Sequence, residues 1–211
     1  MGRLIDRRAF WAVIPALSLA SCARSQVPVQ GKAALLLKGA HSQISKTLAY
    51  DPAYTQLAYP NGDVPLEKGV CTDVVIRAYR AIGIDLQQRV HEDMGGAFAA
   101  YPHAWGLARP DANIDHRRVK TILPWFRRHW TAHSARVDDA GDPLRPGDVV
   151  FFDTFATRAG PDHIGIVSDR LGPSGLPLVI NNWTDGHVTS EMDLLSWVPV
   201  THRFRVPEPV R

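Results

Sequence analysis

The chain has 211 residues, of which 45% are hydrophobic and 21% are charged. This length suffices for one domain with a proper core and short extensions. The formal net charge is +3, but Arg3, Arg7, Arg8 and Asp6 together contribute +2 of it. The nearly neutral remainder gives no indication of nucleic-acid binding.

The first 21 residues have the pattern of a signal peptide. A basic start precedes an apolar run over residues 10–20, which is shorter than the roughly 20 residues that span a bilayer. The sequence Leu19-Ala20-Ser21-Cys22 resembles a bacterial lipobox, in which Cys22 is lipidated, and Arg7-Arg8 resembles a twin-arginine export signal. Cleavage of an ordinary signal peptide nearby is the alternative.

This interpretation predicts a periplasmic protein, exported by the Sec or twin-arginine route and held at the membrane by lipid on Cys22. Ala23, and not Asp, follows the lipidated cysteine, which favours the outer membrane. The chain then divides into a lipidated tether at residues 22–30, a domain at residues 31–206 and a tail at residues 207–211. With Cys22 lipidated, Cys71 has no disulfide partner, and a lone thiol in an oxidising compartment is a liability unless it is used.

Apolar residues at helical spacing predict four helices in the first part of the domain. They cover residues 31–48, 71–82, 90–100 and 119–130. Asp85 is a candidate cap of the third, and Pro124 starts the fourth late or kinks it. Residues 51–65 are rich in turn signals, and residues 84–134 form a helical insert.

Short strands are predicted after residue 144, each bounded by Gly, Pro or Asp. They cover residues 148–153, 163–169, 178–183 and 200–206. Helices first and an antiparallel sheet afterwards make an α+β domain.

Cys71 is the first candidate for chemistry, because it begins a predicted helix. The unpaired N–H groups and positive dipole end of a helix favour the thiolate, which is the nucleophilic form. A buried structural cysteine is the alternative.

His163, which opens a predicted strand, is a candidate base for this thiol. Strand alternation places His163 and Gly165 on one face, where glycine permits a close approach of other backbone. A third polar residue would orient the imidazole. Asn181 and Asn182 are both candidates, and strand alternation does not distinguish them. A structural histidine and turn asparagines are the alternatives.

The order of these motifs resembles the NlpC-type papain-like peptidases of the bacterial cell wall. It consists of helix-borne Cys71, Pro146-Gly147-Asp148, His163-Ile164-Gly165-Ile166 and Val179-Ile180-Asn181. A closer resemblance, over about Leu35 to Arg205, is to the bacterial family catalogued as domain of unknown function 1287. It rests on Tyr59-Pro60-Asn61-Gly62-Asp63, Gly69-Val70-Cys71-Thr72-Asp73, Val90-His91-Glu92-Asp93-Met94 and Pro110-Asp111-Ala112-Asn113-Ile114-Asp115-His116-Arg117-Arg118, as well as on the His163 motif.

The resemblance implies a papain-like α+β core with Cys71 as nucleophile, His163 as base and Asn181 as the orienting residue. It also implies that Tyr59, twelve positions before the cysteine, lines the site near the oxyanion. Thr72, next to the nucleophile, is a further site-lining candidate. Thr72-Asp73 replaces the Ser-Gly of NlpC-type enzymes, and the long insert separates Cys71 from His163; both departures leave the substrate open.

Together these observations predict a cysteine hydrolase, without a cofactor, that cleaves amide bonds in peptidoglycan stem peptides. Candidate substrate-binding residues are Asp73, Asp111, Asp115, His116, Arg117 and Arg118, with a solvated loop as the alternative. A metal site at His91, Asp93, Asp111 and His116 is a weaker alternative, since its spacing is not diagnostic. A cysteine acyltransferase or thioesterase, and a non-catalytic peptidoglycan-associated lipoprotein, remain open.

Overall fold

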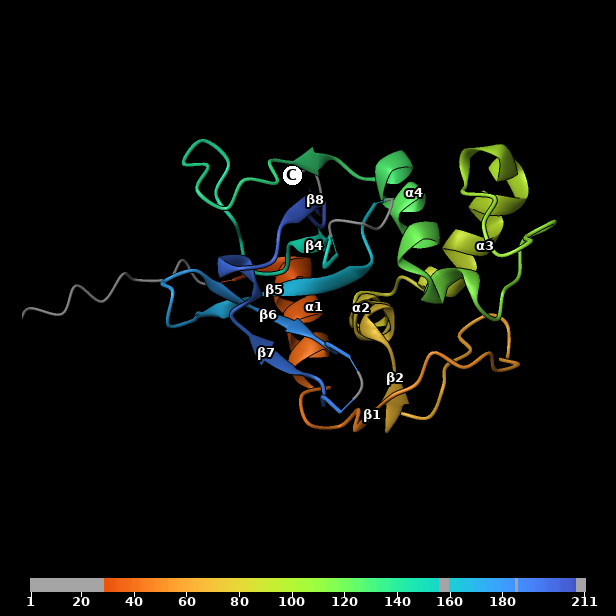
Figure 1. The fold of residues 1–211 in the computed structure, drawn as a ribbon, viewed down its shortest axis with the longest axis horizontal. Helices are drawn as coiled ribbons and strands as arrows, with labels where there is room; N and C mark the ends of the chain where they lie inside the picture. The colour runs from red at the N-terminus through yellow and green to blue at the C-terminus, as the bar shows by residue number, and fades with distance from the viewer. Residues whose placement is uncertain (1–28, 156–159, 185, 208–211) are drawn as a thin grey trace, which may run out of the picture.

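The computed structural model describes residues 29–155, 160–184 and 186–207 (Figure 1). The expected signal peptide, Cys22 and most of the predicted tail lie outside these residues. Within them, no helix has the length and apolar character needed to cross a membrane.

Helices occupy the first part of the described chain. They are α1 (Gly31–His41), α2 (Cys71–Arg80), α3 (Leu86–Ala97) and α4 (Val119–His129), with short 3-10 helices η1 (Phe98–Ala100) and η2 (Asp115–Arg117) between the last two. Asp85 caps α3 by accepting a hydrogen bond from the Gln87 N–H at 3.3 Å. Pro124 lies inside α4. The first helix is shorter than the predicted 31–48, because after His41 the chain turns toward β1.

A six-stranded antiparallel sheet occupies the second part. Its strands are β3 (Ala132–His133), β4 (Val149–Phe152), β5 (His163–Leu171), β6 (Pro177–Asn181), β7 (Ser190–Met192) and β8 (Val200–Phe204), in the order β3-β8-β4-β5-β6-β7. The 3-10 helix η3 (Leu194–Ser196) precedes β8, and β1 (Ala49–Tyr50) pairs in parallel with β2 (Lys68–Gly69). The α+β prediction is therefore confirmed. The prediction missed the short strands β1, β2, β3 and β7, which are too brief to carry a period of two.

Both faces of the sheet are buried. Val149 and Phe151 face the main core, to which all four helices contribute, and Val150 and Phe152 face a smaller core closed by residues 194–198. Figure 1 shows α1 and α2 beside the strands and α3 and α4 beyond them. Val90 of α3 and Phe126 of α4 belong to the main core, so residues 84–134 share the core of the rest of the domain.

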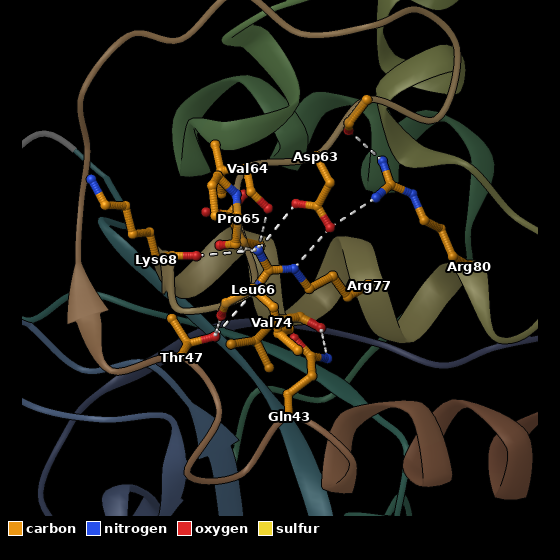
Figure 2. A network of polar contacts seen from close by, with 12 residues as sticks. Gln43, Thr47, Asp63, Val64, Pro65, Leu66, Lys68, Val74, Arg77 and Arg80 are labelled. Carbon is orange, nitrogen blue, oxygen red and sulfur yellow. Dashed lines mark hydrogen bonds and ion pairs between the residues drawn. The ribbon is translucent and has the colours of Figure 1, made fainter.

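The segment before Cys71 is fixed to α2 by Arg77 (Figure 2). Its guanidinium binds the Asp63 carboxylate in a two-pronged contact at 2.9 and 3.1 Å and donates to the carbonyl of Lys68 at 3.2 Å. It also donates to Thr47 Oγ1 at 3.1 Å. Such forked contacts fix orientation as well as distance, so the chain enters α2 at a defined angle.

Candidate active site

The start of α2 is built to present Cys71. The Asp73 carboxylate accepts a hydrogen bond from the Val70 N–H at 2.7 Å, which satisfies a backbone donor at the helix start. Asn182 donates to the carbonyl of Gly69 at 3.3 Å and so ties the preceding residues to the end of β6. As predicted, Cys71 is the first residue of the helix.

The Cys71 thiol lies against the beginning of β5. The backbone N–H groups of Ile164 and Thr72 face the sulfur and favour its thiolate form. Ile166 of β5 pairs with Ile180 of β6. The same register would pair Ile164 with Asn182, but β6 ends one residue earlier, at Asn181. The Ile164 N–H therefore meets the sulfur where a strand carbonyl would otherwise lie, beside His163.

Burial controls the protonation of this thiol. Cys71 is only 3% exposed, and desolvation raises the pKa of its thiol from the ordinary 9.0 to about 12, although the two backbone donors oppose the shift. At neutral pH the sulfur is therefore a neutral thiol, and its ionisation needs a base.

His163 is held in the form such a base requires. Its Nε2 lies 3.1 Å from Asn181 Oδ1, and the Asn181 amide nitrogen donates to the Val179 carbonyl, which fixes the oxygen toward the ring. Nε2–H therefore donates, and Nδ1 keeps a free lone pair. Desolvation lowers the pKa of His163 to about 4, so the imidazole is neutral at pH 7.

The same contacts separate the two candidate asparagines. Asn181 binds His163, whereas Asn182 binds Gly69 and leaves its buried Oδ1 without a partner. Among the described residues, Cys71 Sγ and the imidazole are not hydrogen-bonded to each other. Catalytic hydrogen bonds are often loose before substrate binds. Trp183 packs edge-on against the His163 ring, with 4.8 Å between the ring centroids.

Gly165 has the close approach of other backbone that its lack of a side chain suggested, and the neighbouring backbone is that of β6. A Cβ at this position would overlap a methyl group of Val179 and would lie 3.0 Å from the Ile180 carbonyl oxygen. Glycine thus lets β6 bring Asn181 against His163.

Cys71 borders an open cleft of about 450 Å³. Aromatic, cationic and acidic side chains surround it: Tyr50, Tyr54, Trp105, Arg117, Arg118, Lys120 and Asp162. A second cleft of about 570 Å³ adjoins it and extends along residues 105–114. Cys71 therefore lies in the wall of an elongated, open surface with a basic rim.

Tyr59 does not occupy the place that the resemblance implied. It is 46% exposed, its ring packs edge-on against His91 at 5.2 Å, and it is not among the residues that line the cleft at Cys71. Tyr50 and Tyr54 line that cleft instead. The sequence signal that could have indicated Tyr54 is its position in the turn-rich segment 51–65, where an aromatic side chain has little core to enter.

Asp73 and Arg117, both expected to meet substrate, bind each other. The guanidinium contacts both carboxylate oxygens at 2.9 Å, and both side chains are nearly inaccessible. Although burial opposes it, the hydrogen bonds and charge of Asp73 raise the pKa of Arg117 further above its usual range. Thr72 is also buried and donates from Oγ1 to the Arg117 carbonyl at 2.8 Å. These three side chains position the site, and Thr72 faces the sulfur only through its backbone N–H.

The other predicted substrate-binding residues divide between interior and surface. Asp115 and His116 are buried, and desolvation lowers the pKa of His116 to about 3 and raises that of Asp115. Arg118 lines both clefts, and Asp111 lines the second. Only these last two lie where a ligand could reach them.

The four residues of the metal alternative do not come together. Asp93 is engaged by Arg128 and His129, at 2.8 and 2.9 Å, while Asp111 binds Tyr54. In the described part of the chain, one group of three His, Cys, Asp or Glu side chains brings its ligand atoms together. It consists of His41, Asp169 and Glu191. His41 ends α1, Asp169 lies on β5 and Glu191 lies on β7.

The pKa of Cys71 leads to a prediction for its alkylation by iodoacetamide. A thiol pKa of about 12 in place of the ordinary 9.0 reduces the thiolate fraction about a thousandfold near pH 8. The rate in the folded protein should therefore rise about tenfold per pH unit from pH 8 to pH 11, while the urea-unfolded chain levels off above pH 9. A rate that is already flat below pH 8 in the folded protein would reveal a preformed thiolate and contradict this expectation.

Comparisons with known proteins confirm the resemblance to the family of domain of unknown function 1287. The family described as "Domain of unknown function (DUF1287)" matches residues 37–206. An Escherichia coli protein, "Uncharacterized protein YijF", is 48% identical over 164 residues, covering 78% of this chain and 77% of that protein. A Staphylococcus aureus crystal structure described as similar to a lipoprotein of the NLP/P60 family aligns with a TM-score of 0.42 and 10% identity. That alignment covers 87% of this chain and 44% of the other.

Proposed function

The chain belongs to the DUF1287 family, and we propose that it is a cysteine hydrolase of papain-like type that cleaves amide bonds through Cys71. The observation that carries the proposal is the His163 imidazole, which Asn181 fixes with Nδ1 free and which burial keeps neutral at pH 7. The next residue, Ile164, directs its backbone N–H toward the Cys71 sulfur. A buried structural cysteine needs neither an oriented base nor a cleft.

The reaction follows from these groups. His163 takes the proton from Cys71 as Sγ bonds to the substrate carbonyl carbon, and the resulting oxyanion is stabilised by backbone donors at the start of α2. The imidazolium then gives its proton to the amine as the C–N bond breaks. Water, deprotonated by His163, attacks the thioester; the products are a carboxylic acid and an amine, and the thiol regains its proton.

The proposed substrate is a peptidoglycan stem peptide. Arg118 and Lys120 at the rim of the cleft suit the carboxylates of such a peptide. We propose that this activity lies on the periplasmic side of a membrane, with the outer membrane favoured. The resemblance of the first 22 residues to a signal peptide with a lipobox at Cys22 supports this location.

Digestion of purified peptidoglycan tests this function. Wild type should release soluble fragments with new carboxyl and amino termini, identified by mass spectrometry, and Cys71→Ala should release none, because the nucleophile is lost. Unaltered circular dichroism and thermal unfolding of Cys71→Ala would show that the fold is retained.

The alternatives give different results in the same digestion. Covalent attachment of an acyl group to an added amine would indicate an acyltransferase. If wild type and Cys71→Ala both bind peptidoglycan and neither releases fragments, the protein is a non-catalytic wall-binding protein and the hydrolase proposal is rejected.

A further inference from the structure

Two exposed aromatic side chains stand at the junction of the two clefts. Tyr54 is 60% exposed and Trp105 is 55% exposed, and both line both clefts. Leaving an aromatic ring in water forfeits the hydrophobic stabilisation that its burial would provide. Two such rings on one concave surface indicate a ligand-binding surface.

Tyr54 is held rigidly although it is exposed. Its hydroxyl donates to Asp111 Oδ2 at 3.0 Å and accepts from the Asn113 amide nitrogen at 2.9 Å. Asn113 Oδ1 in turn accepts from the Leu57 N–H at 2.8 Å. The ring therefore keeps one orientation before any ligand arrives, which lowers the entropy lost on binding.

Trp105 is held outward by both its backbone and its neighbour. Its φ is +58° and that of Gly106 is +68°, a left-handed conformation that is costly for a bulky residue and occurs preferentially at ligand sites. The Arg118 guanidinium lies 4.4 Å from the indole centroid and forms an ion pair with Asp115 at 3.7 Å. The indole is thus a fixed platform beside a charged donor.

We infer that Tyr54, Trp105 and Arg118 form a saccharide subsite that binds an N-acetylated hexosamine. One face of a pyranose ring presents C–H groups that complement the electron-rich face of an aromatic ring. Its hydroxyl and amide groups need planar donors and acceptors, and Arg118 and Asp111 supply them. The second cleft combines these two features, whereas a free peptide would not require the aromatic platform.

This inference rests on the proposed function in one respect. If Cys71 cleaves the stem peptide in the first cleft, the adjoining cleft holds the sugar to which that peptide is attached. The preferred substrate is then a glycan-linked stem peptide and not a free one.

Calorimetric titrations of the Cys71→Ala protein test the subsite without turnover. The probes are a chitin tetrasaccharide, a stem peptide attached to its disaccharide, and the same stem peptide free. We expect the glycan-linked peptide to bind at least about tenfold more tightly than the free one. Adding Trp105→Ala or Tyr54→Ala should remove this difference and abolish tetrasaccharide binding. The matched control is Tyr59→Ala, an exposed aromatic outside both clefts, which should change neither.

The outcomes separate the subsite from the hydrolase. Equal affinity for the glycan-linked and free peptides, or equal weakening of both by Trp105→Ala, would overturn the saccharide subsite even if wild type digests peptidoglycan. Tetrasaccharide binding that depends on Trp105 would support the subsite even if no fragment is ever released. Matching thermal unfolding of all variants excludes a loss of fold as the cause.

Discussion

Replacing His163 with alanine is expected to lower kcat/KM for release of peptidoglycan fragments by about 10²–10⁴-fold, the usual contribution of a general base. The loss should lie toward the upper end of this range. With its pKa at about 12, the Cys71 thiol does not ionise at neutral pH without a proton acceptor. The measurement is the initial rate of fragment release, compared between variant and wild type at equal protein concentration.

The matched control for this substitution is His103→Ala. His103 is an exposed histidine whose ring contacts Phe98, away from both clefts. The His103→Ala variant should retain the wild-type rate of fragment release. If His163→Ala works as fast as His103→Ala, the imidazole takes no part in the reaction and the proposed mechanism fails.

The pH dependence of the rate of fragment release is a second test of His163. Because the folded pKa of His163 is lowered to about 4, the imidazole stays unprotonated, and therefore able to accept a proton, as the pH falls to near 5. The rate should then decline as the pH passes through 4. Asn181→Asp places a carboxylate against Nε2 and should move this decline to higher pH, since a nearby negative charge favours the imidazolium. A role of Asn181 in packing alone would leave the decline where it is.

The sequence was sufficient for the parts of the site that depend on local pattern. The helix at Cys71 and the strand at His163 lie where apolar spacing and turn residues predict them. Pattern alone left Asn181 and Asn182 equivalent; the contact with His163 depends on how far β6 extends, which tertiary pairing decides.

Local sequence pattern could not predict where the charged residues lie. Sequence shows that Asp73 and Arg117 carry opposite charges, but nothing in their spacing shows that they meet in the interior. The resemblance implied a place for Tyr59 twelve positions before Cys71, but the intervening segment has little regular structure, so sequence spacing does not fix where the side chain lies. The chain there brings Tyr54 to the cleft and leaves Tyr59 beside His91.

The Asp73–Arg117 pair is expected to have the largest effect on stability. Arg117→Met should lower the free energy of unfolding by about 3–5 kcal/mol, because it leaves the Asp73 carboxylate buried without its partner. Arg117 also donates to the carbonyls of Ala53 and Asp51, at 3.1 and 3.0 Å, so the substitution frees the segment that carries Tyr54. Urea unfolding followed by circular dichroism measures the change.

A surface ion pair provides the control. Arg136 contacts Asp138 at 3.1 Å with both side chains more than 70% exposed, and Arg136→Met should leave the free energy of unfolding nearly unchanged. An equal effect of the two arginine substitutions would contradict the importance of burial. The double variant Asp73→Asn, Arg117→Met should be more stable than Arg117→Met alone, since it removes the unpaired charge and keeps an oxygen to accept from the Val70 N–H. That oxygen holds the start of α2, so the double variant should also keep Cys71 in place, and its alkylation should retain the wild-type pH dependence.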